Sequence, residues 1–211
     1  MELAGKKILV FGTGISGISA AKLLQTVGSE VILYDGNKEL DCERVLGNFD
    51  KVQDIKLYVG ELPEEVRTAL DLVVLSPGVP TDLPLVNVLK NAGIPIWGEI
   101  ELAYQCGKGD VLAITGTNGK TTTTALLGEI MKSYYSDVNV VGNIGVPYTG
   151  VVENSTDDTV TVAEISSFQL ETIDAFRPKV SAVLNITPDH LNRHHTMDNY
   201  IAAKMLSLIH I

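Results

Sequence analysis

Gly12-Thr13-Gly14-Ile15-Ser16-Gly17 has the spacing GxGxxG and lies between a short apolar run, 6–11, and an amphipathic stretch, 16–27. A strand, a glycine turn and a helix in that order are the context in which this spacing indicates a nucleotide site. The glycines permit a tight turn and the close approach of a pyrophosphate to the helix N-terminus. Asp35 ends the next apolar run about 20 residues on, where a carboxylate accepts from a ribose or base. The alternative is a glycine turn that only lets the helix pack on the strand.

The chain around this turn alternates short apolar runs with amphipathic stretches. Near-continuous apolar strands separated by helices are typical of a parallel sheet covered on both faces. The sequence therefore predicts an α/β fold that begins with a Rossmann-like parallel sheet of about five strands, one fewer than the double nucleotide-binding arrangement. We expect strands at 6–11, 30–35, 55–59, 72–76 and 94–97, and helices at 16–27 and near 62–69 and 83–92.

A second glycine-rich turn, Gly116-Thr117-Asn118-Gly119-Lys120-Thr121, follows the apolar run VLAIT at 111–115. It ends in GKT as a phosphate-binding loop does, although it is two residues shorter than GxxxxGK[ST]. Backbone N–H groups of such a loop cradle phosphates, Lys120 reaches the β and γ oxygens, and the Thr121 hydroxyl ligates Mg²⁺. Because strand, loop and helix coincide, ATP binding is favoured over a turn with an exposed lysine.

The chain divides at Gly107-Lys108-Gly109 into two units, 1–107 and 108–211. The second unit is predicted to be a P-loop-type α/β ATPase domain. We expect its strands at 111–115, 138–141, 159–164 and 179–185, and its helices at 121–134 and from 197 onward. The last helix has only begun where the sequence ends, so we expect this domain to be incomplete and the chain to be truncated.

Polar residues follow two strands of the second unit. Glu164 ends one apolar strand, and beside a phosphate loop it is a natural second ligand for the Mg²⁺ of Thr121; the alternative is a charged residue at a solvated strand end. Asp189 and His190 follow the next strand and are expected to face the same crevice. His194 and His195 have no ligand spacing and are expected at the surface. From the residues alone, Lys204 would be a solvated helix lysine.

Composition restricts the function further. The 211 residues are 45% hydrophobic and carry 26 Asp+Glu against 16 Lys+Arg, a net charge of −10. This composition excludes disorder and disfavours a nucleic-acid partner. Cys42 and Cys106 match no zinc or disulfide spacing, and no apolar run approaches a signal core or a membrane span, so we expect a soluble cytoplasmic protein without membrane insertion.

Two nucleotide sites in tandem favour an ATP-driven ligase or kinase whose second substrate carries a nucleotide. An NAD-dependent oxidoreductase is supported by the first glycine motif and Asp35 alone, and the phosphate loop argues against it. A non-catalytic nucleotide-binding module is a third interpretation. The oligomeric state is not encoded in any pattern we find.

These residues resemble those of the Mur ligases, cytoplasmic enzymes that build the peptide stem of bacterial peptidoglycan. The loop TGTNGKT at 115–121 is shared across that superfamily and with folylpolyglutamate synthases. SSFQLE at 166–171, GTGISGIS at 12–19 and LSPGVP at 75–80 resemble more specifically the members that add D-glutamate, and the segment 187–204 fits the same members. The resemblance implies ATP-dependent ligation of D-glutamate to UDP-N-acetylmuramoyl-L-alanine through an acyl phosphate. A Mur ligase that adds another amino acid is the alternative.

The resemblance also implies a set of site residues. The UDP-linked substrate would be bound by Ile15, Ser16, Asp35, Gly36, Asn37, Ser76, Pro77, Gly78, Asn143 and Ser166. ATP would be bound by Gly116, Thr117, Asn118, Gly119, Lys120, Thr121 and Thr122. Two Mg²⁺ ions are implied, one on Thr121 and Glu164 and the other on His190 and a carbamylated Lys204. Lys120, His190 and Lys204 are the implied catalytic residues.

The family continues well past the end of this sequence, with the rest of the central domain and a third domain that binds D-glutamate. The final residues, SLIHI at 207–211, do not resemble the family's continuation. We therefore predict that these 211 residues alone do not complete the ligation.

Overall fold

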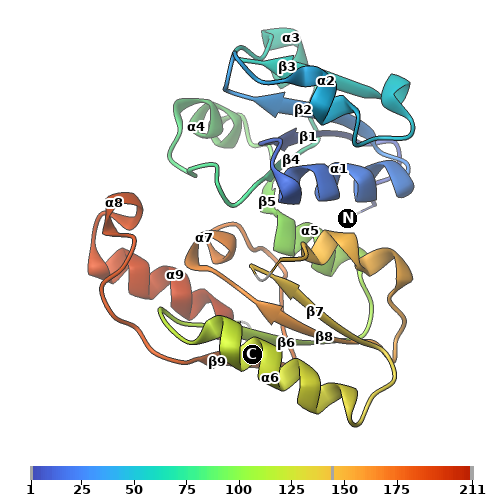
Figure 1. Ribbon diagram of the computed structural model, residues 1–211. Helices are drawn as coiled ribbons and strands as arrows, with labels where there is room; N and C mark the ends of the chain where they lie inside the picture. The colour runs from blue at the N-terminus through green and yellow to red at the C-terminus, as the bar shows by residue number, and fades with distance from the viewer. Residues whose placement is uncertain (1, 144, 210–211) are drawn as a thin grey trace.

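The computed structural model describes residues 2–143 and 145–209 and contains two parallel β-sheets, one above the other in Figure 1. The N-terminal sheet has five strands in the order β3-β2-β1-β4-β5. Its strands are β1 (Lys7–Phe11), β2 (Glu30–Asp35), β3 (Ile55–Val59), β4 (Leu72–Leu75) and β5 (Ile96–Gly98). Its helices are α1 (Ile15–Thr26), α2 (Cys42–Leu46), α3 (Glu64–Arg67) and α4 (Pro84–Asn91). The predicted Rossmann-like sheet of five strands is confirmed.

Alternate residues of β1 explain why this sheet is covered on both faces. Ile8 and Val10 belong to a buried cluster that includes Leu24 of α1, whereas Leu9 and Phe11 pack in a separate cluster with Leu89 of α4. Each strand residue therefore loses its apolar surface to one helix layer or the other. Parallel pairing of β1 with β2 and with β4 brings the carboxyl ends of these strands to one edge.

The second sheet has four strands in the order β7-β8-β6-β9, again all parallel. They are β6 (Asp110–Thr115), β7 (Val138–Gly142), β8 (Val160–Glu164) and β9 (Val180–Val183). The accompanying helices are α6 (Lys120–Lys132), α7 (Ser167–Leu170), α8 (Leu191–His194) and α9 (Met197–Ile209). Short 3₁₀ turns lie at Val52–Asp54, Tyr148–Gly150 and Val152–Asn154. His210 and Ile211 of the SLIHI segment lie outside the described residues.

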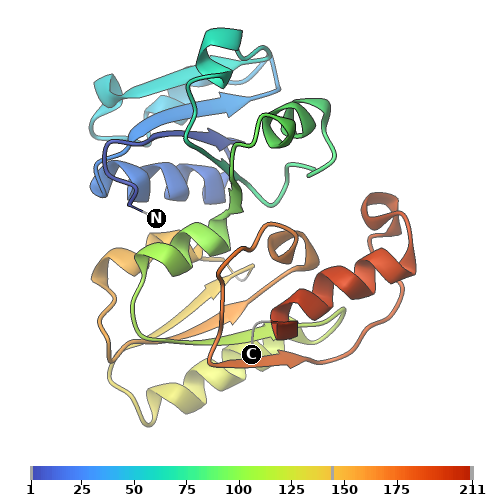
Figure 2. The ribbon, with the colours of Figure 1, turned by 180° about the vertical axis from the view of Figure 1, so that it is seen from behind.

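Helix α5 (Glu99–Cys106) connects the two sheets, and Figure 2 shows it between them from the other side. The sequence patterns did not predict this helix. Its buried residues Ile100 and Ala103 belong to the same apolar cluster as Val10 of the first sheet and Ala163 of the second. One hydrophobic core therefore runs from the N-terminal sheet through α5 into the second sheet.

Several predicted elements are shorter in the structure than in the sequence interpretation. The helix expected over 121–134 ends at Lys132, and the strand expected over 179–185 is confined to 180–183. Beyond that strand the backbone turns to the glycine-rich loop, where Thr117 N–H donates to the Asn185 carbonyl oxygen at 2.9 Å. No helix among the described residues is long and apolar enough to cross a membrane.

Candidate nucleotide-binding cleft

The first glycine motif joins β1 to α1, and its geometry requires glycine at two positions. Gly12 has a φ of 99°, a left-handed conformation that favours glycine. A Cβ on Gly17 would lie 1.9 Å from the Gly12 carbonyl oxygen, so the helix contacts the turn directly. Gly14 precedes the helix in extended conformation, and no side chain caps the first amides of α1. These amides are therefore available to an anion.

Asp35 at the end of β2 organises this turn. Its carboxylate accepts hydrogen bonds from the Thr13 backbone at 3.1 Å and the Thr13 hydroxyl at 2.8 Å, and its other oxygen accepts from the Asn37 amide at 3.0 Å. Thr13, which the sequence interpretation did not single out, is the residue that holds this acidic group against the glycine turn. The carboxylate and the first amides of α1 thus have a fixed relative position.

A cleft of about 570 Å³ lies between the carboxyl-terminal edges of the two sheets. This volume is in the usual range for small-molecule sites. Seven residues implied by the resemblance line it: Ile15, Ser16, Asp35, Ser76, Pro77, Gly78 and Asn143. Gly36, Asn37 and Ser166 are not among its lining residues, whereas Gln169, which was not predicted, is. Ser166 instead caps α7, where its side chain and that of Gln169 form a reciprocal capping box.

The second glycine motif joins β6 to α6. Gly119 precedes the helix with a φ of 82°, and no side chain caps the N-terminal amides of α6. Lys120 donates from Nζ to the Thr117 carbonyl oxygen of the same loop at 2.9 Å. Asn185 supports the loop from outside, since its side chain accepts from the Asn118 amide at 2.9 Å and donates to the Asn118 carbonyl at 3.0 Å. Glycine backbone, exposed amides and a lysine therefore coincide as in a phosphate-binding loop.

Glu164 ends β8 and is 1% exposed. One carboxylate oxygen accepts from the Asn143 side-chain amide at 3.0 Å, and the other is buried without a hydrogen-bond partner among the described residues. A solvated strand end is thus excluded for this residue. Because an unpartnered buried carboxylate oxygen is costly, the position fits a cation that would complete it.

Lys204 of α9 is also buried, with 2% of its surface exposed, so its description as a solvated helix lysine is wrong. Its ammonium group donates to the Gly116 carbonyl oxygen at 2.9 Å and lies 4.8 Å from the centre of the Tyr200 ring. Burial, with a further contribution from the charge of Lys120, lowers the pKa of Lys204 to about 8. The neutral fraction of this amine near neutral pH is therefore larger than that of a solvated lysine.

His190 lies at the start of α8 in a left-handed conformation, with a φ of 51°. Its side chain is exposed, its Nε2 lies 3.5 Å from a carboxylate oxygen of Asp189, and its ring centre lies 5.0 Å from that of Phe168. Among the described residues, no three His, Cys, Asp or Glu side chains form a metal-binding group by themselves. A Mg²⁺ ion here would accordingly depend on phosphate oxygens for part of its coordination, as this metal commonly does.

Comparisons with known proteins agree with this arrangement. The model described as Mur ligase MurD-like, N-terminal domain matches residues 6–98, and the model described as Mur ligase middle domain matches residues 114–208. The chain belongs to the Mur ligase family. The first match covers β1, the first glycine motif and α1, and the second covers the end of β6, the second glycine motif and α6.

Curated Mur ligases resemble nearly the whole chain. It is 60% identical over 205 residues to the UDP-N-acetylmuramoylalanine--D-glutamate ligase of Lachnoclostridium phytofermentans, a match that covers 97% of this chain and 45% of that protein. Identity is 57% to the ligase of the same name from Lachnospira eligens and 51% to that from Clostridioides difficile, with the same coverage. The chain thus spans under half the length of these relatives.

A solved Mur ligase shares the fold. The UDP-N-acetylmuramate:L-alanyl-gamma-D-glutamyl-meso-diaminopimelate ligase from Neisseria meningitides superposes with a TM-score of 0.61 and 18% identity. The match covers 99% of this chain and 69% of that one. The mixed α/β architecture with two parallel sheets is therefore that of a Mur ligase.

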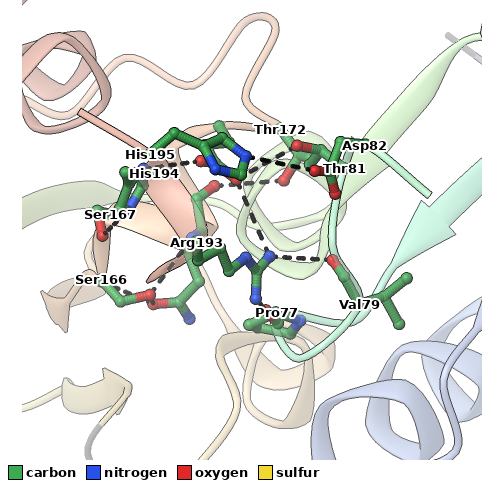
Figure 3. Close-up of polar contacts among 12 residues, drawn as sticks. Pro77, Val79, Thr81, Asp82, Ser166, Ser167, Thr172, Arg193, His194 and His195 are labelled. Carbon is green, nitrogen blue, oxygen red and sulfur yellow. Dashed lines mark hydrogen bonds and ion pairs between the residues drawn. The ribbon is translucent and has the colours of Figure 1, made fainter. Parts of the chain in front are cut away.

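This Mur ligase chain also contains a polar cluster that the sequence interpretation missed (Figure 3). Ser167 Oγ lies 2.9 Å from Nε2 of His194, whose Nδ1 lies 3.1 Å from a carboxylate oxygen of Glu171. The expectation that His194 lies at the surface is wrong, because only 3% of it is exposed. His195 does extend outward, with 65% of its side chain exposed.

The cluster has the hydrogen-bond order of a nucleophilic triad but not its accessibility. Ser167 is 2% exposed, so a substrate carbonyl has no route to its hydroxyl. Burial, reinforced by the positive charge of Arg193, lowers the pKa of His194, which favours the neutral ring. Its Nε2 is hydrogen-bonded to the Ser167 hydroxyl, and its Nδ1 faces the Glu171 carboxylate. The cluster therefore joins α7 to α8 and is not a reaction centre.

Proposed function

We propose that this chain carries the UDP-substrate and ATP sites of an ATP-dependent ligase that joins D-glutamate to UDP-N-acetylmuramoyl-L-alanine. The observation that carries the proposal is the cleft between the two sheets, which is lined by the first glycine turn, the segment 76–79 and Asn143 together. The sequence identity to curated D-glutamate ligases favours D-glutamate over the amino acid that another Mur ligase would add. We propose 1–107 as the UDP-substrate domain and 108–211 as the ATP-binding domain, in a cytoplasmic enzyme.

The substrate's pyrophosphate would lie on the amides at the start of α1, which no side chain caps. Asp35, held by Thr13, would accept from the uridine part, with Gly36 and Asn37 beside it. Ser76, Pro77, Gly78 and Asn143 would contact the rest of the substrate and direct its carboxylate toward the second glycine loop. Ser166 would act indirectly, because its cap fixes α7 and with it Gln169 at the cleft wall.

ATP would bind with its phosphates on the loop from Gly116 to Thr122 and on the ammonium group of Lys120. In the proposed reaction a carboxylate oxygen of the UDP-linked substrate attacks the γ-phosphorus, the bond to the β–γ bridging oxygen breaks, and ADP leaves. The amine of D-glutamate then attacks the acyl-phosphate carbon, inorganic phosphate leaves, and the nitrogen loses a proton to give the amide. Lys120 balances charge on the transferred group, and the loop amides fix its position.

Thr121 and Glu164 would hold one Mg²⁺, and the unpartnered buried oxygen of Glu164 supports this assignment. His190 and carbamylated Lys204 would hold a second. Bound Mg²⁺ neutralises charge on the phosphoryl group during its transfer. The buried amine of Lys204, with its pKa near 8, has the neutral fraction that reaction with CO₂ requires, and Gly116 positions it beside the loop.

Calorimetric titration with UDP-N-acetylmuramoyl-L-alanine, with NAD titrated in parallel, tests this proposal. We expect saturable binding of the UDP-sugar and none of NAD. Asp35→Asn should weaken binding at least tenfold, whereas Asp41→Asn, at the N-cap of α2 and outside the cleft, should not change it. Binding of NAD alone would contradict the ligase and favour an oxidoreductase.

A further inference from the structure

Arg193 of α8 connects the two halves of the molecule. It donates from one terminal nitrogen to the Pro77 carbonyl oxygen at 2.8 Å and from the other to the Val79 carbonyl oxygen at 3.0 Å. These carbonyls flank Gly78 in the segment 76–79 that lines the cleft. Figure 3 shows the guanidinium group directed at both of them. A planar fork of donors matches two carbonyls in a way that a lysine ammonium cannot.

The second unit holds Arg193 in place for this contact. The guanidinium carbon lies 4.0 Å from the centre of the Phe168 ring, and a terminal nitrogen lies 3.9 Å from the Glu171 carboxylate. Glu171 is fixed in turn by the buried ring of His194. Only 17% of the Arg193 side chain is exposed, so its interactions are less screened by water than those of a surface arginine.

The contact reaches the first glycine turn through the same segment. Ser76 donates from Oγ to the Gly12 carbonyl oxygen at 3.1 Å, and the Val79 amide donates to the Ser76 carbonyl at 2.9 Å. Within the second unit, Arg193 lies in α8, whose N-cap residue is His190. The position of the segment 76–79 therefore depends on the placement of α8.

We propose that Arg193 is a positioning residue that fixes the segment 76–79 in its substrate-binding shape and links it to α8. The proposal rests on the proposed function, because it assigns that segment to the UDP-linked substrate. Without the two hydrogen bonds, the carbonyls of Pro77 and Val79 return to water and the segment samples other shapes. Substrate binding must then also order the segment 76–79, which lowers the apparent affinity.

The test compares three variants of this chain by calorimetry with UDP-N-acetylmuramoyl-L-alanine and by amide hydrogen exchange. Arg193→Met should lower the affinity at least tenfold and speed exchange of the Val79 amide at least tenfold. Arg193→Lys, which keeps the charge but loses the fork, should fall between Arg193→Met and wild type. His195→Gln is the matched control at the same junction, since His195 contacts Asp82 and not the segment, and it should match wild type.

Each outcome bears on a different claim. Wild-type affinity and wild-type protection of Val79 in Arg193→Met would overturn the positioning role. If Arg193→Met does not fold, Arg193→Lys decides, because a lower melting temperature with unchanged affinity would indicate structure alone. Failure of the wild-type chain to bind the UDP-sugar would overturn the proposed function, and the exchange rate of Val79 would still report whether Arg193 orders the segment.

Discussion

Gly14 and Gly17 belong to one motif but face different surroundings, which makes them a matched pair for substitution by alanine. A Cβ on Gly17 would lie 1.9 Å from the Gly12 carbonyl oxygen and 2.8 Å from Ser76 Oγ, whereas a Cβ on Gly14 would meet nothing within 4 Å. Gly14 also has a φ of −71°, which any residue adopts. We expect Gly17→Ala to destabilise the fold and Gly14→Ala to leave it nearly unchanged.

The cost at Gly17 follows from the contact. Backbone cannot rotate away as a side chain does, so the start of α1 must move outward from β1, and overpacking of this kind costs about 1–3 kcal/mol or more. The higher helix propensity of alanine returns about 1 kcal/mol at most. A 1.9 Å approach to a backbone oxygen places the cost at the upper end, about 3 kcal/mol, so the net loss is about 2–3 kcal/mol. This loss corresponds to a melting temperature lower by roughly 4–12 °C for a chain of this size.

Thermal unfolding followed by circular dichroism measures this difference, and titration with the UDP-sugar separates stability from binding. Gly14→Ala should keep the melting temperature within roughly 3 °C of wild type, since the expected change is below about 1 kcal/mol. Its affinity should fall, because the new methyl group projects where a pyrophosphate approaches the backbone. Equal melting temperatures for the two variants would refute the reasoning about Gly17.

Three further perturbations test the buried polar groups. Because the pKa of His194 lies below its unfolded value of 6.5, the wild type should lose stability as the pH falls through and below 6.5, and His194→Gln should lose less between pH 7 and 5 in thermal melts. Thr149→Val removes a hydroxyl donor from the buried carboxylate of Glu99 and should cost about 1–3 kcal/mol in urea unfolding, whereas Thr149→Ser should cost little. Glu164→Gln should reduce Mg²⁺-dependent ATP binding at least tenfold without lowering the melting temperature, and Glu153→Gln in the exposed loop should change neither.

Local pattern was sufficient for the strands of both sheets. The segments 30–35 and 55–59 were predicted to the residue, because short runs rich in apolar and β-branched residues carry the strand signal locally, both in the buried β2 and in the partly exposed edge strand β3. The glycine motifs were also located from spacing, because turn, strand and helix are contiguous in sequence. Burial of Glu164 could not be derived, since it depends on Asn143 and on neighbouring strands.

Helix α5 was missed because its burial depends on partners distant in sequence. Glu101 accepts hydrogen bonds from the backbone amides of Asp174, Ala175 and Phe176. The first turn of α5 contains two acidic residues, Glu99 and Glu101, so the start of this helix shows no apolar periodicity. His194 was misjudged, and Arg193 was not singled out, for a related reason. Charged residues in a loop are exposed by default, and the hydrogen bonds that join Arg193 to the first unit reach carbonyls more than a hundred residues away in sequence.

Two of the distant contacts between the sheets lie at separate places along the cleft. On one side Arg193 binds the segment 76–79. On the other side the Thr149 amide and hydroxyl donate to the Glu99 carboxylate, and the Thr149 hydroxyl oxygen lies 2.9 Å from Ser19 Oγ of α1. The ribbon in Figure 1 places α8 and α1 apart, with the carboxyl edges of the sheets between them. The apolar core around α5 also joins the two sheets. Two separated contacts fix their relative orientation, so loss of Arg193 should reshape the cleft while the Glu99 contact keeps the two units together.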